Sequence, residues 1–139
     1  GPLWSRLQEG EAVILADQRT VTPEQVLGPP RKGRKVSYVT DTTHTESLSQ
    51  EVGGSDLFIC EGMFSQELEE SAREKKHLTA VQAATIAKEA GRIKQLGLIH
   101  YSPRYTEREL KQLLKEAREV FPDTFLCRDG QAINVPYED

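Results

Sequence analysis

The stretch Lys35-Val-Ser-Tyr-Val-Thr-Asp-Thr42 decides the fold prediction. Its side chains alternate with a period of two, which is the pattern of a β-strand. The pattern ends at Asp41, where the chain turns into Thr43-His44-Thr45. In α/β folds the functional groups gather at the carboxyl ends of strands. We therefore predict a strand that delivers the Asp41 carboxylate to a functional edge.

Two further strand patterns end in the same way. Asp56–Glu61 is apolar in its middle, as a buried parallel strand requires, and Leu96–His100 is apolar up to its last residue. Together with the first stretch they place Asp41, Glu61 and His100 at three strand exits. We expect these three side chains to lie near one another.

Helix signals separate the strands. Thr79 and Thr106 each open a capping box, with Gln82 and Glu109 three residues later. Shorter helices are predicted over Thr45–Val52 and Ser65–Lys76. The alternation of strand and helix over residues 34–139 predicts an α/β fold with a largely parallel sheet.

The two ends of the chain carry weaker patterns. Residues 1–33 are interpreted as an irregular lead-in, with brief strand candidates at Glu11–Leu15 and Arg19–Val21 and a helix start at Thr22. At the other end, Thr124–Cys127 and Ala132–Val135 predict two closing strands joined as a hairpin.

Composition sets the broad class. The 139 residues are 37% hydrophobic and 29% charged, which is typical of one globular domain. No stretch is apolar enough to span a membrane and none resembles a signal peptide, so a cytoplasmic location is expected. Cys60 and Cys127 are far apart in the sequence and each ends an apolar strand-like run, which predicts two buried thiols rather than a disulfide or a zinc knuckle.

The net charge of −4 argues against a protein coated for nonspecific nucleic-acid binding. One basic patch, Arg31-Lys32-Gly33-Arg34-Lys35, leads into the first strand. A solvated loop is the interpretation that composition favours; a phosphate contact is the alternative.

The residues alone predict half of a metal site. Asp41 and His100 are two ligands that suit Zn²⁺, whereas a catalytic zinc ion takes three protein ligands. The other histidines, His44 and His77, lie in turns, where a solvated imidazole is the ordinary outcome.

Four ordered motifs resemble those of ribonuclease Z, the tRNA 3′-end-processing endoribonuclease family of the metallo-β-lactamase superfamily. Two further stretches, residues 1–4 and 27–33, also resemble it, so the likeness covers nearly the whole chain. The four motifs are Val39–Thr42, Asp56–Met63, His77–Ala84 and His100–Tyr105.

The resemblance implies a role for each matching residue. Asp41 is expected to bridge two zinc ions and His100 to be a further zinc ligand. Glu61 and His77 are expected to protonate the leaving oxygen after phosphodiester cleavage. Ser102, Arg104 and Tyr105 are expected to face the substrate phosphate. His44 matches no family residue and is expected to be solvated.

The family's His-x-His-x-Asp-His signature does not occur in this sequence. The chain is therefore expected to be the carboxy-terminal half of one metallo-β-lactamase-like αββα sandwich, with a mixed sheet covered by helices. Alone it is expected to bind metal poorly and to cleave nothing measurable. The expected partners of the complete zinc enzyme are precursor tRNA and a second copy as a homodimer, and no membrane. The alternatives are another hydrolase of the superfamily, or a non-catalytic fragment that works by association.

Overall fold

The computed structural model describes residues 1–29, 32–43 and 46–137. Two compact units are present, Gly1–Gly33 and Arg34–Asp139, and each is described by itself. No helix among the described residues is both long and apolar enough to cross a lipid bilayer.

The first unit is more ordered than the predicted irregular lead-in. Helix α1 (Pro2–Gln8) was not expected; its proline lies in the first turn, where the missing N–H costs nothing. Strands β1 (Val13–Ile14) and β2 (Thr20–Val21) pair antiparallel, as the brief strand candidates predicted. Helix α2 (Pro23–Val26) follows the predicted Thr22 cap.

The second unit is a four-stranded sheet in the order β3-β4-β5-β6. All three strand pairs are parallel, so the predicted α/β class with a parallel sheet is confirmed. The strands are β3 (Val36–Val39), β4 (Leu57–Glu61), β5 (Leu96–Ile99) and β6 (Thr124–Leu126).

Helices alternate with these strands along the chain. They are α3 (Glu46–Val52), the 3-10 helix η1 (Gln66–Leu68), α4 (Glu69–Lys75), α5 (Ala80–Ala90) and α6 (Glu107–Val120). Both predicted capping boxes form, because the Thr79 and Thr106 hydroxyls accept hydrogen bonds from the Gln82 and Glu109 backbone N–H groups. The single predicted helix over Ser65–Lys76 divides into η1 and α4.

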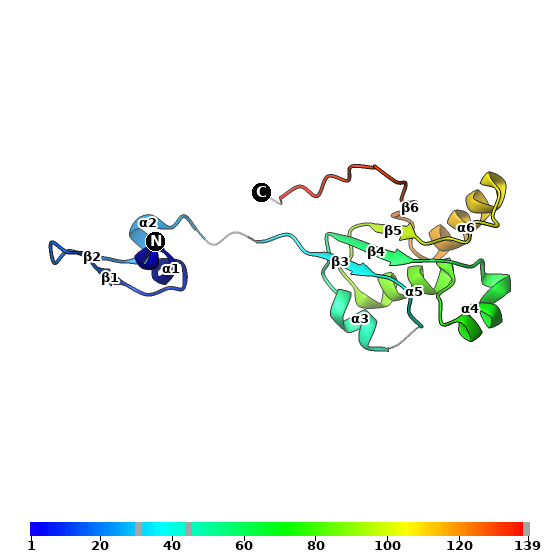
Figure 1. Cartoon of the computed structure of the whole chain (residues 1–139), viewed down its shortest axis with the longest axis horizontal. Helices are drawn as coiled ribbons and strands as arrows, with labels where there is room; N and C mark the ends of the chain where they lie inside the picture. The colour runs from blue at the N-terminus through cyan, green and yellow to red at the C-terminus, as the bar shows by residue number, and fades with distance from the viewer. Residues whose placement is uncertain (30–31, 44–45, 138–139) are drawn as a thin grey trace. The chain divides into compact units, whose positions relative to one another are not determined.

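One apolar core holds the sheet to its helices. Helices α3, α5 and α6 lie on one face of the sheet (Figure 1) and share a buried cluster with β4 and β5. Four alanines of α5 are almost fully buried there, which lets the helix approach the sheet closely; they are Ala80, Ala83, Ala84 and Ala87. The central members of this cluster are Phe58, Cys60, Leu78, Ala83, Ala84, Ile86, Leu96, Leu98 and Leu113.

The predicted closing hairpin is wrong. Strand β6 pairs parallel with β5, and residues 132–135 form no strand. The chain after β6 returns towards the start of β3 instead. There Arg34 donates to the Val135 carbonyl at 2.8 Å and its guanidinium lies 4.0 Å from the centre of the Tyr137 ring.

The parallel register places the strand exits together. Val39 lies opposite Cys60, and Glu61 lies opposite Ile99, so β3, β4 and β5 end at one edge of the sheet. Two glycines permit the close packing behind this edge. A side chain at Gly62 would meet the Ala80 backbone at 3.2 Å, and one at Gly97 would meet Ile59 and Cys127 at 2.6 Å.

Candidate metal and catalytic site

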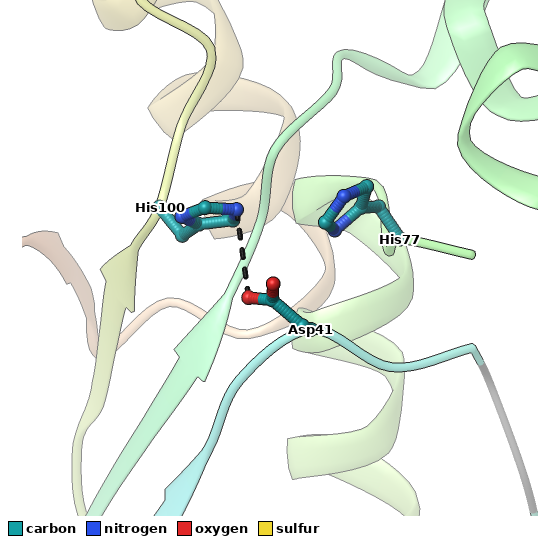
Figure 2. Close-up of side chains that lie close together, drawn as sticks. All are labelled: Asp41, His77 and His100. Atoms are coloured by element: carbon teal, nitrogen blue, oxygen red, sulfur yellow. Dashed lines mark ion pairs between the residues drawn. The ribbon is translucent and has the colours of Figure 1, made fainter. Parts of the chain in front are cut away.

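Asp41, His77 and His100 converge at this edge. Each offers one ligand atom, and these atoms lie within 4.8 Å of one another. Figure 2 shows Asp41 below the two imidazole rings, with Asp41 following β3, His100 following β5 and His77 coming from the turn before α5. The predicted convergence of Asp41 and His100 is present, and His77 joins them.

Asp41 and His100 form the exposed part of the site. The His100 Nε2 atom lies 3.5 Å from Asp41 Oδ1, and the two side chains are 41% and 63% exposed. Both residues have positive φ angles, 30° for Asp41 and 56° for His100. Such backbone angles are uncommon for residues other than glycine and recur at functional sites.

The Asp41 carboxylate carries the negative charge that binding a cation requires. Thr40 Oγ1 donates to Asp41 Oδ1 at 2.8 Å. This hydrogen bond, followed by the nearby His100 and His77 rings, holds the pKa of the Asp41 carboxyl below its usual value. The group is therefore ionised at neutral pH.

Glu61 and His77 form the buried part of the site. The Glu61 side chain is fully buried, and that of His77 is 16% exposed. His77 Nδ1 lies 3.2 Å from Glu61 Oε1 and 3.1 Å from Oε2. A carboxylate on Nδ1 orients the imidazole and leaves its other nitrogen for a metal ion or for proton transfer.

The loop before α5 is fixed against β4, and this fixes His77. The His77 N–H donates to the Ala72 carbonyl at 2.9 Å, and Phe64 bridges to Thr79. Because Gly62 has no side chain, the start of α5 reaches the end of β4, and Glu61 and His77 meet there.

A carboxylate and two imidazoles are donors that Zn²⁺ and similar ions accept. Asp41, His77 and His100 therefore fit a metal ion by their chemistry and their spacing. Two ligand assignments are consistent with this geometry. His77 is either a third ligand or a proton donor beside a centre held by Asp41 and His100.

The three residues expected to face the substrate phosphate differ in their exposure to solvent and in their hydrogen-bond partners. Arg104 is exposed. Ser102 is 6% exposed and its N–H donates to the Met63 carbonyl. The Tyr105 hydroxyl accepts a hydrogen bond from the Ser65 N–H at 2.8 Å, so its contact is with the fold.

Two residues of the basic patch, Arg34 and Lys35, lie away from the site. Lys35 Nζ donates to the Glu51 and Gly53 carbonyls, and Arg34 holds the carboxy-terminal segment; both precede β3, at the opposite end of that strand from Asp41. These contacts favour a structural role over a phosphate contact. Arg31 and His44 lie outside the described residues.

The sequence did not reveal a cavity of about 520 Å³ next to His77. Its walls come from the turn after Asp41, from η1 and α4, and from α5, and they are lined by Thr43, Gln66, Glu67, Glu69, Glu70, Arg73, His77 and Gln82. Glu69 accepts hydrogen bonds from the amides of Gln66 and Gln82, which fixes this wall. In the sequence, Glu67, Glu69 and Glu70 indicated only the start of a helix, and Gln82 indicated only the cap of α5, so neither pattern pointed to a cavity.

Comparison with solved structures defines the class. The chain is similar to YhfI, a metallo-β-lactamase-fold protein from Bacillus subtilis, with a TM-score of 0.60 and 27% identity over 67% of this chain and 36% of YhfI. It is also similar to the short form of human tRNase Z, with a TM-score of 0.58 and 26% identity over 84% of this chain and 37% of the human protein. The fold is thus that of the carboxy-terminal part of a metallo-β-lactamase-fold protein.

Sequence relatives define the family. The chain is 58% identical to ribonuclease Z of Treponema denticola over 139 residues, which are 100% of this chain and 45% of that relative. It is 44% identical to ribonuclease Z of Lachnoclostridium phytofermentans over 98% of this chain and 44% of that relative. No protein-family model matches the chain. The chain is thus homologous along its whole length to the carboxy-terminal part of ribonuclease Z, and it spans less than half the length of the relatives it matches.

Proposed function

We propose that the complete protein containing this chain is a zinc-dependent endoribonuclease that removes the 3′ trailer from precursor tRNA. The observation that supports the proposal most is the convergence of Asp41, His77 and His100 in a chain homologous to ribonuclease Z along its whole length. This chain supplies part of the active site, and the remaining ligands lie outside it.

Asp41 and His100 would hold zinc, with two ions in the complete enzyme. When bound, zinc supplies Lewis-acid activation of water and stabilises negative charge on the phosphate. Asp41 is suited to this role because it is ionised and because its backbone turn presents it at the sheet edge.

His77 would protonate the leaving oxygen, with Glu61 as its partner. The Glu61 carboxylate contacts Nδ1 and fixes the direction of the ring. The other ring nitrogen then delivers the proton at the scissile bond, a contribution of typically ~10²–10⁴-fold in rate. Arg104, Ser102 and Tyr105 remain predicted phosphate contacts, and Arg104 is exposed as that role requires.

Cleavage of precursor tRNA by the complete protein tests this proposal. We expect His77→Ala to lower cleavage by about 10²–10⁴-fold while the zinc content stays unchanged. Loss of zinc from this variant would make His77 a ligand, and unchanged cleavage would remove it from proton transfer. Absence of precursor tRNA cleavage by the wild-type protein, with hydrolysis of another phosphodiester or ester, would favour the alternative superfamily hydrolase.

The predicted homodimer and the cytoplasmic location remain predictions. The strand β3 offers a surface for association, since Val36 and Tyr38 are 57% and 66% exposed. Sedimentation of the chain with Tyr38→Lys alongside the wild type tests the homodimer. We expect the wild type to dimerise and the variant to shift towards monomer; a monomeric wild type would contradict the prediction.

A further inference from the structure

The Glu61 carboxylate makes a second contact, which its role as the partner of His77 does not explain. Its Oε1 atom accepts the backbone N–H of Thr42 at 2.7 Å. Thr42 follows Asp41 directly, so this hydrogen bond fixes the peptide that carries the Asp41 carbonyl. A hydrogen bond to a buried carboxylate oxygen is stronger than one exposed to water, because the surroundings screen it less.

The Asp41 turn needs such a fixed point. Asp41 follows the end of β3, is exposed, and has a φ of 30°, which is uncommon for residues other than glycine. The β-ladder ends before it, because the last paired residue of β3 is Val39. The Thr42–Glu61 hydrogen bond ties the turn back to the end of β4, next to where the ladder stops.

We propose that Glu61 is a positioning residue for the metal centre. It holds the Asp41 turn through the Thr42 N–H while it orients His77 through Nδ1. One buried carboxylate thus sets the place of a metal ligand relative to the proposed proton donor. The metal-binding part of this inference is independent of the substrate; the link to proton transfer rests on the proposed function.

Three variants of the complete protein separate the two contacts. Glu61→Gln keeps a carbonyl oxygen for Thr42 but presents an amide to His77, whereas Glu61→Ala removes both contacts. His77→Ala removes only the imidazole. Glu74→Gln is the matched control, because Glu74 is an exposed carboxylate on α4.

Zinc affinity, measured by competition with a chromophoric chelator, is the first readout. We expect Glu61→Ala to weaken it by about 10–100-fold, the range found when outer partners of metal ligands are lost. Glu61→Gln, His77→Ala and Glu74→Gln should stay close to the wild type. Wild-type affinity in Glu61→Ala, or equal loss in Glu61→Gln, would overturn the proposal.

Hydrogen exchange at the Thr42 amide in the metal-free protein is the second readout. We expect slow exchange in the wild type and Glu61→Gln and fast exchange in Glu61→Ala. If Glu61→Ala does not fold, an amide-to-ester replacement at residue 42 removes the same donor with Glu61 intact, and it should weaken zinc binding similarly. Unchanged zinc affinity in the ester would overturn the proposal. If only the proposed function is wrong, precursor tRNA is not cleaved, but zinc affinity and hydrogen exchange at Thr42 still change as expected.

Discussion

Two pairs of side chains meet at one sheet edge, and they differ in how they are held. The pair Glu61 and His77 is buried, with its atoms at hydrogen-bonding distance. The pair Asp41 and His100 is about half exposed, and 3.5 Å is too long for a good hydrogen bond. The buried pair is held by hydrogen-bonding partners within this chain, whereas the exposed pair leaves about half of its surface open to further groups.

The largest expected difference between the pairs concerns metal-dependent activity. If the proposed function holds, His100→Asn in the complete protein should abolish measurable cleavage of precursor tRNA and lower the zinc content, because a proposed zinc ligand is removed. Asparagine tolerates the left-handed backbone that His100 adopts, so the free energy of unfolding should change by less than about 0.5 kcal/mol. Zinc analysis, cleavage and thermal unfolding check this; normal zinc content would contradict the ligand assignment.

The free energy of unfolding should depend more on the buried pair than on the exposed pair. Glu61→Ala leaves the Thr42 N–H without its acceptor and His77 without its partner, and should cost about 1–3 kcal/mol in the free energy of unfolding. Asp41→Asn, at an exposed position whose positive φ asparagine tolerates, should cost less than about 0.5 kcal/mol. Denaturant unfolding of the metal-free chain measures both. Equal costs would mean that burial does not distinguish the two carboxylates.

A smaller effect should follow from the cap beside His77. Thr79→Ala removes the hydroxyl that accepts from the Gln82 N–H and donates to Gln66, and should cost about 1 kcal/mol. Thr106→Ala removes the equivalent cap of α6 at a similar cost. Only Thr79→Ala should also lower cleavage, because His77 lies two residues away. Equal activities of the two variants would show that the Thr79 cap does not influence the position of His77.

The smallest expected effect concerns the two thiols. Burial, and then the charge of Glu61, raises the pKa of Cys60, and burial raises the pKa of Cys127. At pH 8 both should therefore hold less thiolate than an exposed cysteine and react slowly with a disulfide reagent. Cys127, which is less buried, should react first and faster as the pH rises; Cys60 should react only on unfolding. Fast reaction of Cys60 in the native protein would contradict its burial.

The sequence predicted the strands and capped helices because their signals are local. The alternation from Val36 to Val39, the apolar run of β4 and the capping boxes each lie within a few residues. Asp41, Glu61 and His100 were placed together because parallel strands end at one edge. His77 was linked to them by the family resemblance, since nothing in its local sequence shows that α5 begins beside β4.

The failures concern contacts between distant segments. The hairpin after β6 was wrong because Arg128-Asp129-Gly130 indicates a turn but not where the chain goes next. The link between Glu61 and the Thr42 N–H was not foreseeable, because a backbone donor leaves no mark in the sequence. Gly62 shows the same limit, because its close approach to Ala80, which leaves little room for a side chain, is visible only in the structure.

The positive φ angles of Asp41 and His100 have a consequence for protein engineering. Glycine adopts such angles without steric cost, so a stabilising redesign guided by the backbone would favour glycine at both positions. That redesign would remove both of the expected metal ligands. At this edge, the sequence that would be most stable differs from the sequence that the proposed metal site requires.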